Sequence, residues 1–228
     1  MSHDDIARTF DEWVKNGEAA GLQDGHGDVV GQVIASIEFK AGDQTLDLGC
    51  GTGWATRLLA NGAPGSGAVG VDVSPEMIAQ AESLHDWTYR ARYERGTFEN
   101  LDFPDGKFDH VFSMEALYYA VDVTAALSEV ARVMKSGATA DLVIDHFSDS
   151  VHTRSWGESI GLSLHTLSEA EWKSAVEDAG LSGVTTSRVI DTRMPDEATF
   201  KPNVHCPTWE ARMELHQAGS LWIHATKP

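Results

Sequence analysis

The chain has 228 residues, of which 42% are hydrophobic, and this suits one α/β domain with a single sizeable core. Its formal net charge is −18, with 35 acidic residues against 17 basic ones. This charge argues against a nucleic-acid partner, which would need a basic surface to displace phosphate counterions.

The sequence gives no indication of a membrane segment or of a disulfide bond. No apolar run approaches the length that spans a bilayer, and the acidic start at residues 1–5 lacks the apolar region of a signal peptide, so we expect no membrane insertion. Cys50 lies in a glycine-rich turn, where a disulfide to Cys206 would obstruct a ligand. We therefore expect a reduced, cytoplasmic protein. A homodimer is among the assemblies that the sequence leaves open.

The N-terminal residues are predicted to form a helical arm. Apolar residues on one side indicate a helix over 4–15, and Asp28 is placed to cap a second helix over 29–37. Between them, Gly25-His26-Gly27 indicates a loop over 16–27. A histidine in such a loop either contacts only solvent or reaches an active site.

A strand over 44–48 leads into three alternating glycines, Gly49, Gly51 and Gly53, and then into a helix over 52–61. Glycine lets a ligand lie directly against the main chain. The first strand-to-helix turn of an open α/β sheet lies at the edge where such sheets bind ligands. The next strand, 68–73, contains Asp72 about 20 residues past the glycines, where an acid can bind ribose hydroxyls.

The spacing D-x-G-x-G-x-G, followed by V-G-V-D-V-S, resembles the class I S-adenosylmethionine (SAM)-dependent methyltransferases. Within them it is most similar to the small-molecule, ubiquinone/menaquinone-type (methyltransferase-11-like) branch. The resemblance implies an α/β fold with a doubly wound, Rossmann-like seven-stranded sheet. The strand order would be 3-2-1-4-5-7-6 with strand 7 antiparallel, under an N-terminal helical lid. We expect a single domain over 1–228, with a lid (1–40), a SAM-binding core (41–147) and a substrate-side insertion with the last strands (148–228).

The same resemblance implies SAM as cofactor and S-adenosylhomocysteine as product. Asp47 would orient the turn or the methionine ammonium. In the loop after a strand over 90–96, Thr97 replaces the family's usual adenine-binding Asp, Phe98 would meet the base, and Glu99 is the nearest compensating acid. The residues expected to bind the cofactor are Asp47, Gly49, Cys50, Gly51, Thr52, Gly53, Asp72, Val73, Met77, Thr97, Phe98, Glu99, Ser113 and Met114.

The segment after a strand over 110–113 resembles the family's S-N-E-x-L-Y element, with Met114 in place of Asn. Glu115 and Tyr118 would lie near the methyl group, because a sulfonium is attracted to carboxylates and aromatic faces. Core packing explains Tyr118 equally well.

His146 directly follows a strand over 138–145 and lies at the ligand edge of the predicted sheet. It is the best candidate for a general base or substrate anchor, and a hydrogen bond to a neighbouring carbonyl is the alternative. Together, the candidate catalytic residues are His146, Glu115, Tyr118 and His26.

The second half of the chain is less regular. Residues 149–167 interrupt the alternation and are predicted to be an insertion that shapes the substrate pocket. The remaining elements are predicted as helices at 122–134 (ended by Gly137), 168–179 and 210–215, strands at 181–191 and 220–226, and a loop at 193–208.

The predicted activity is transfer of a methyl group from SAM to a small-molecule acceptor. Thr97 and Met114 keep open the alternative of a non-catalytic SAM-binding regulatory or partner protein. An NAD-dependent oxidoreductase is disfavoured because G-x-G-x-G departs from the dinucleotide spacing. No histidine pair has metal-ligand spacing, so no metal site is expected. The N-P-P-Y motif of amino-directed nucleic-acid methyltransferases is also absent.

The acidic charge is explained either by an ordinary solvated surface or by adaptation to high salt, which screens self-repulsion to a range of a few ångströms. We hypothesise a halophilic source. The thermal unfolding midpoint is then expected to rise as KCl is added, and a midpoint that does not rise would contradict the hypothesis.

Overall fold

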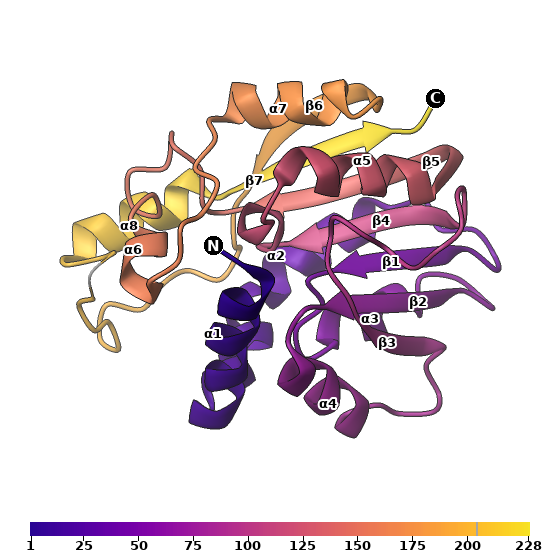
Figure 1. Cartoon of the computed structure of the whole chain (residues 1–228). Helices are drawn as coiled ribbons and strands as arrows, with labels where there is room; N and C mark the ends of the chain where they lie inside the picture. Colours follow the sequence, from indigo (N-terminus) through magenta and orange to yellow (C-terminus); the bar gives the residue numbers. More distant parts are fainter. Residues whose placement is uncertain (204) are drawn as a thin grey trace.

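The computed structural model describes residues 1–203 and 205–228, and in them a seven-stranded sheet forms the centre of the molecule (Figure 1). The strand order is β3-β2-β1-β4-β5-β7-β6. Strands β1 to β5 pair in parallel, whereas β7 runs antiparallel to both β5 and β6. The order and the antiparallel seventh strand confirm the predicted fold.

The strands are β1 (Gln44–Leu48), β2 (Gly67–Asp72), β3 (Ala91–Arg95), β4 (Phe108–Met114), β5 (Met134–Ile144), β6 (Ser182–Val189) and β7 (Ser220–Thr226). The helices are α1 (His3–Asn16), α2 (Leu22–Ser36), α3 (Trp54–Leu59), α4 (Pro75–Ser83), α5 (Val123–Val133), α6 (Trp156–Ile160), α7 (Glu169–Asp178) and α8 (Trp209–Ala218), with short 3₁₀ turns η1 (Glu18–Gly21) and η2 (Leu117–Tyr119).

Local sequence signals placed several helix starts correctly. Ser74 caps α4 by accepting from the Met77 amide, with Pro75 at the first helical position. Ser168 and Glu171 form the predicted capping box at the start of α7.

The predicted loop over 16–27 is wrong in its second half. Helix α2 already begins at Leu22, so His26 is helical. Asp28 does not cap a helix, because its carboxylate accepts hydrogen bonds from the backbone amide and the hydroxyl of Thr192 (2.8 and 2.7 Å). Docking against a segment more than 160 residues away thus stabilises a glycine-rich helical turn that local propensity disfavours.

Two further boundaries differ from prediction. Gly137 does not end α5, since β5 starts at Met134, directly after the helix. The glycine instead has a φ of +80° inside β5, next to a shift in the β4–β5 register between Phe108 and His110. Helix α8 extends well beyond the predicted 210–215, from Trp209 to Ala218.

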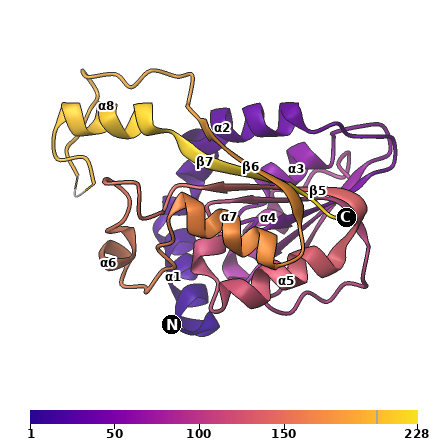
Figure 2. The same cartoon turned by 90° about the horizontal axis from the view of Figure 1, so that it is seen from above.

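Helices cover both faces of the sheet (Figure 2). Helices α2 and α3 pack on one face around the buried Val30, Val33 and Leu59. Helices α5 and α7 cover the other face, where Leu127 and Trp172 are fully buried. No helix in the described residues is both long and apolar enough to cross a membrane.

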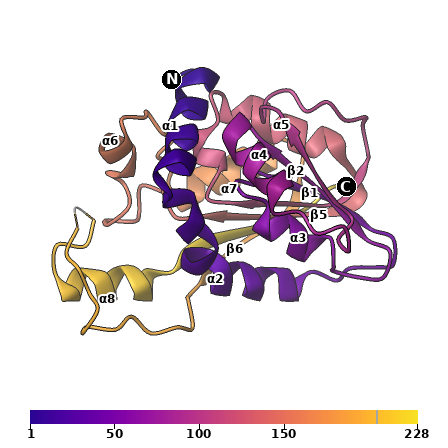
Figure 3. The same ribbon diagram turned by 90° about the horizontal axis from the view of Figure 1, so that it is seen from below.

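The carboxyl ends of the parallel strands point toward α1, α6 and α8 (Figure 1). Helix α1 runs beside α4, as the view from below shows (Figure 3). The predicted sheet edge for ligand binding is therefore overlain by elements from both ends of the chain.

Candidate functional site

A cavity of about 400 Å³ lies at the carboxyl ends of the central strands. Its floor is the glycine-rich turn after β1 together with the residues that follow β2, β4 and β5. Its cover includes Phe10 and Trp13 of α1, Trp156 of α6 and Leu215 of α8. Most of the wall is apolar, and the polar groups in it are few and convergent.

The glycine-rich turn is held by Asp72. One carboxylate oxygen accepts from the Gly51 amide (2.9 Å), and the other accepts from the Ser74 amide (2.9 Å). Gly49 and Gly51 have φ values of +74° and +51°, a left-handed backbone that favours glycine. Burial raises the pKa of Asp72 despite these hydrogen bonds.

Asp47 is a buried acid that lines the same cavity. Its Oδ2 accepts from the Thr56 hydroxyl (2.6 Å). Burial raises its pKa to about 7, since no cationic side chain forms an ion pair with it among the described residues. A cationic ligand group would favour the ionised form of Asp47, so the donor set fits an ammonium.

Three of the predicted cofactor residues lie behind the cavity wall. The Ser113 hydroxyl donates to the Leu48 carbonyl (3.0 Å) and links β4 to β1. The Thr52 carbonyl accepts from Arg57. A Cβ at Gly53 would lie 2.4 Å from the Tyr93 ring, so this glycine admits a packed aromatic side chain and not a ligand.

The predicted adenine side of the site lines the cavity through Val73, Met77, Thr97 and Phe98. Met77 is also buried, so it packs in the core as well as lining the cavity. The Glu99 carboxylate forms hydrogen bonds with other parts of the chain.

The oxygens of Glu99 bind the N-terminal arm and the start of α5. Oε2 lies 2.8 Å from His3 Nε2, and Oε1 accepts from the amides of Val121 and Asp122. Because both oxygens have partners, compensation for the missing adenine-binding Asp is not supported by this geometry.

His146 lines the cavity but has no free ring nitrogen. Nδ1 lies 2.8 Å from the Thr153 carbonyl, and Nε2 lies 2.8 Å from the Thr166 hydroxyl. Burial lowers its pKa. The geometry therefore favours the alternative, in which His146 anchors the insertion after β5, over a general base.

The cavity brings together two groups that can exchange a proton, His26 and Glu115. His26 Nδ1 lies 3.0 Å from Glu115 Oε1, and both side chains are partly buried. The carboxylate raises the pKa of His26, whereas the imidazolium, acting against burial, lowers that of Glu115. The buried Tyr118 follows Glu115 in the cavity wall.

Asp145 joins this pair, and the sequence analysis missed it. Burial and the nearby Glu115 carboxylate raise its pKa well above the ordinary value. The available signal was its position at the end of the strand that neighbours Glu115's strand. The same position at the ligand edge of the sheet pointed to His146, the next residue along the chain.

The second half of the chain supplies much of the cover, and the cavity lining by Trp156 agrees with the predicted insertion over the site, whereas the residues from the long loop and α8 were not predicted. The indole Nε1 of Trp156 donates to the Tyr119 hydroxyl (2.6 Å), linking the insertion to the segment after β4. His205, Cys206 and Arg212 reach the cavity from the long loop and α8. Their spacing carries no motif, so only the fold reveals them.

The N-terminal arm is tied to the cofactor side of the site. The Asp11 carboxylate accepts from the Ser74 hydroxyl (2.6 Å) at the start of α4. Asp72 binds the amide of the same serine. The arm therefore covers the cavity by direct contact with the loop that holds the glycine-rich turn.

Residues 46–140 match a family described as a methyltransferase domain. The chain is 34% identical over 123 residues to the uncharacterized methyltransferase YcgJ of Bacillus subtilis (53% of this chain, 47% of that protein). It is 33% identical over 149 residues to malonyl-(acyl-carrier protein) O-methyltransferase of Erwinia billingiae (64% and 55%). It spans about half the length of these curated relatives.

Among solved structures, the chain is similar to one in a complex between the Haloferax volcanii Trm112 methyltransferase activator and a candidate methyltransferase. The identity is 34%, the TM-score is 0.87, and the match covers 96% of this chain and 97% of that one.

Substitution of Gly53 tests whether this glycine is required for packing. Gly53→Ala is expected to cost about 1–2 kcal/mol for the left-handed backbone and about 1–3 kcal/mol more for the contact with Tyr93. Gly17→Ala is the matched control, because Gly17 has a φ of +80° and open space around its Cβ position. Denaturant unfolding measures both, and equal losses would contradict the packing role.

Proposed function

Since the chain belongs to the class I SAM-dependent methyltransferases, we propose that it transfers a methyl group from SAM to a small-molecule acceptor bound in the same cavity. The observation that carries this proposal is the cavity itself. It combines the glycine-rich turn held by Asp72 with a separate, aromatic-lined end where an acceptor can bind.

We assign the cofactor contacts from the cavity wall. Asp47 would bind the methionine ammonium, and Asp72 would accept from the ribose hydroxyls with its remaining lone pairs. Val73, Met77 and Phe98 would enclose the adenine, with Thr97 offering one uncharged hydrogen bond. The bare backbone of Gly49 and Gly51 would let the cofactor approach the turn.

When bound, SAM supplies an electrophilic methyl group, and its sulfur leaves as a neutral thioether. The chain's residues then act mainly by positioning the two reactants. Tyr119 and Trp156, joined by their hydrogen bond, would form the wall at the acceptor end, and α1 would exclude water. His26 and Glu115 are the groups placed to move a proton from an acceptor that must lose one.

A non-catalytic SAM-binding protein is the second candidate. It is favoured by two departures from the family's pattern, Thr97 in place of the adenine-binding acid and Met114 in place of Asn. Conversion of SAM to S-adenosylhomocysteine in the presence of a metabolite pool supports the enzyme, and SAM binding without turnover supports the second candidate.

We infer a salt-rich, cytoplasmic setting for the protein. The charge of −18 and the similarity to a Haloferax volcanii chain support the salt adaptation. Cys50 and Cys206 are both free and buried, which suits a reducing compartment.

Calorimetric titration of SAM and of NAD, in molar KCl, tests the cofactor assignment. SAM is expected to bind and NAD is not, and Asp72→Ala should weaken SAM binding by about tenfold to a hundredfold, through loss of charge-assisted hydrogen bonds. Asp102→Ala is the control, since Asp102 is exposed. Equal affinity in wild type and Asp72→Ala, or preferential binding of NAD, would overturn the assignment.

We further infer that the chain works with an activator subunit similar to Trm112. The similarity to a chain in the Haloferax volcanii complex supports this inference. So does an exposed apolar surface just before the edge strand β3, where Trp87 is 92% exposed and Leu84 is 52% exposed. Exposed aromatic side chains of this kind are common interface anchors.

Co-expression with Haloferax volcanii Trm112 tests the partner. The tagged chain is expected to retain Trm112 on an affinity column, and Trp87→Ala should weaken the complex by at least about tenfold. Met194→Ala is the control, because Met194 is 68% exposed after β6, at the opposite edge of the sheet. The inference fails if Trm112 is not retained, or if both variants bind it equally.

A further inference from the structure

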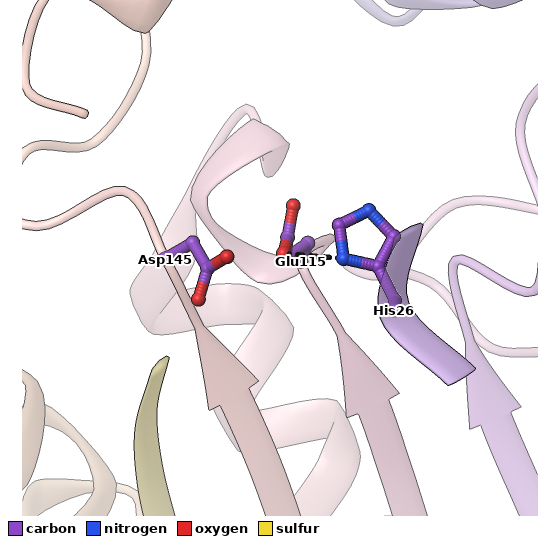
Figure 4. A group of neighbouring side chains, drawn as sticks. All are labelled: His26, Glu115 and Asp145. Atoms are coloured by element: carbon purple, nitrogen blue, oxygen red, sulfur yellow. Dashed lines mark ion pairs between the residues drawn. The ribbon is translucent and has the colours of Figure 1, made fainter. Parts of the chain in front are cut away.

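Three side chains with metal-binding atoms converge at one end of the cavity (Figure 4). His26 comes from α2, Glu115 directly follows β4, and Asp145 directly follows β5. One ligand atom from each side chain lies within 4.8 Å of the other two. All three side chains line the cavity.

The sheet and the arm fix this convergence. Strands β4 and β5 are paired neighbours, and the Glu115 amide still donates to the Val143 carbonyl (2.9 Å) at the end of the ladder. The two carboxylates therefore leave the same sheet edge side by side. His26 reaches them only because α2 extends back to Leu22.

The carboxylate oxygens of the cluster can accept more hydrogen bonds than the surrounding groups donate to them. Asp145 Oδ1 exposes less than 1 Å² and has no hydrogen-bond partner among the described residues. Glu115 Oε1 is equally enclosed, and it forms an ion pair with His26 Nδ1, at 3.0 Å. An enclosed acceptor without a partner is destabilising, and a second carboxylate nearby adds repulsion.

The backbone at Glu115 is unusual as well. Within the described part of the chain, it is the one residue other than glycine with a positive φ, +49°. Such a backbone conformation is strained in a residue other than glycine, and strained residues are concentrated at functional sites. Here it places a carboxylate between the imidazole and the second carboxylate (Figure 4).

We propose that His26, Glu115 and Asp145 bind a divalent transition-metal ion. An imidazole with two carboxylates is a ligand set that suits Mn²⁺, Fe²⁺ or Zn²⁺ better than the all-oxygen preference of Mg²⁺ or Ca²⁺. A cation would supply the partner that the enclosed Asp145 oxygen lacks and would remove the repulsion between the carboxylates.

The ion would also define the acceptor. Three protein ligands leave coordination positions open toward the cavity, as in catalytic metal sites. An acceptor with a hydroxyl or carboxylate oxygen could occupy them beside the methyl donor. This part rests on the proposed function, whereas binding of the ion does not.

Titration of the full chain with MnCl₂, after treatment with a chelator and dialysis, tests the site. Calorimetry and the electron paramagnetic resonance signal of free Mn²⁺ are expected to show one ion bound per chain. His26→Gln, Glu115→Gln and Asp145→Asn should each weaken binding by at least about tenfold. Glu214→Gln is the control, since this 69% exposed acid pairs with His152 outside the cluster, and it should leave binding unchanged.

If the variants do not fold, the Mn²⁺ titration of wild type alone tests the metal site. Folded wild type that binds no Mn²⁺, or variants that bind it as tightly as wild type, would overturn the proposal and leave the cluster as a proton-sharing ion pair. SAM titration on the same sample separates the metal-site proposal from the SAM cofactor assignment. SAM binding without Mn²⁺ binding rejects the metal site only, and Mn²⁺ binding without SAM binding rejects the cofactor assignment only.

Discussion

The structure depends on the Asp72 carboxylate at the end of β2, because each of its two oxygens accepts a hydrogen bond from a different segment. One oxygen holds the amide of Gly51 in the turn after β1, and the other holds the amide of Ser74 at the start of α4. Ser74 in turn donates to Asp11 of the N-terminal arm. A single buried acid thus fixes the glycine-rich turn, the next helix and, through that helix, the arm that covers the cavity.

The distribution of buried acids suits a cationic donor. Asp47, Asp72, Glu115 and Asp145 all line a cavity whose wall is otherwise mainly apolar. Burial raises the pKa of three of them, so each gains from a cation nearby. SAM carries a sulfonium as well as an ammonium, and the product loses the sulfonium charge. An acidic cavity therefore binds the charged donor more favourably than the product that has lost the sulfonium charge.

The arm and the second half of the chain together cover the cavity. His26 arrives from α2, Trp156 from the insertion after β5, and Arg212 from α8. Aromatic contacts join these layers, since Trp13 of α1 meets Trp156 edge to face at 6.0 Å. The glycine-rich turn belongs to one continuous strand–turn–helix unit, whereas this cover depends on segments that are distant in sequence.

The sheet order was expected only from the resemblance to the family, not from local spacing. The sequence by itself determined the bounds of β1 and β7, the caps at Ser74 and Ser168, and the cavity-lining positions of Asp47, Gly51 and Asp72. These depend on local spacing, turn chemistry and alternation, which a short stretch of sequence contains. Only the tertiary structure decided that His26 is helical, that both nitrogens of His146 are bonded, and that Asp145 joins Glu115. Each of these outcomes depends on a partner far away along the chain, such as Thr192 for the docking of α2 and Thr166 for His146. Local spacing carries no information about such partners, and the sheet brings them together only once it has formed.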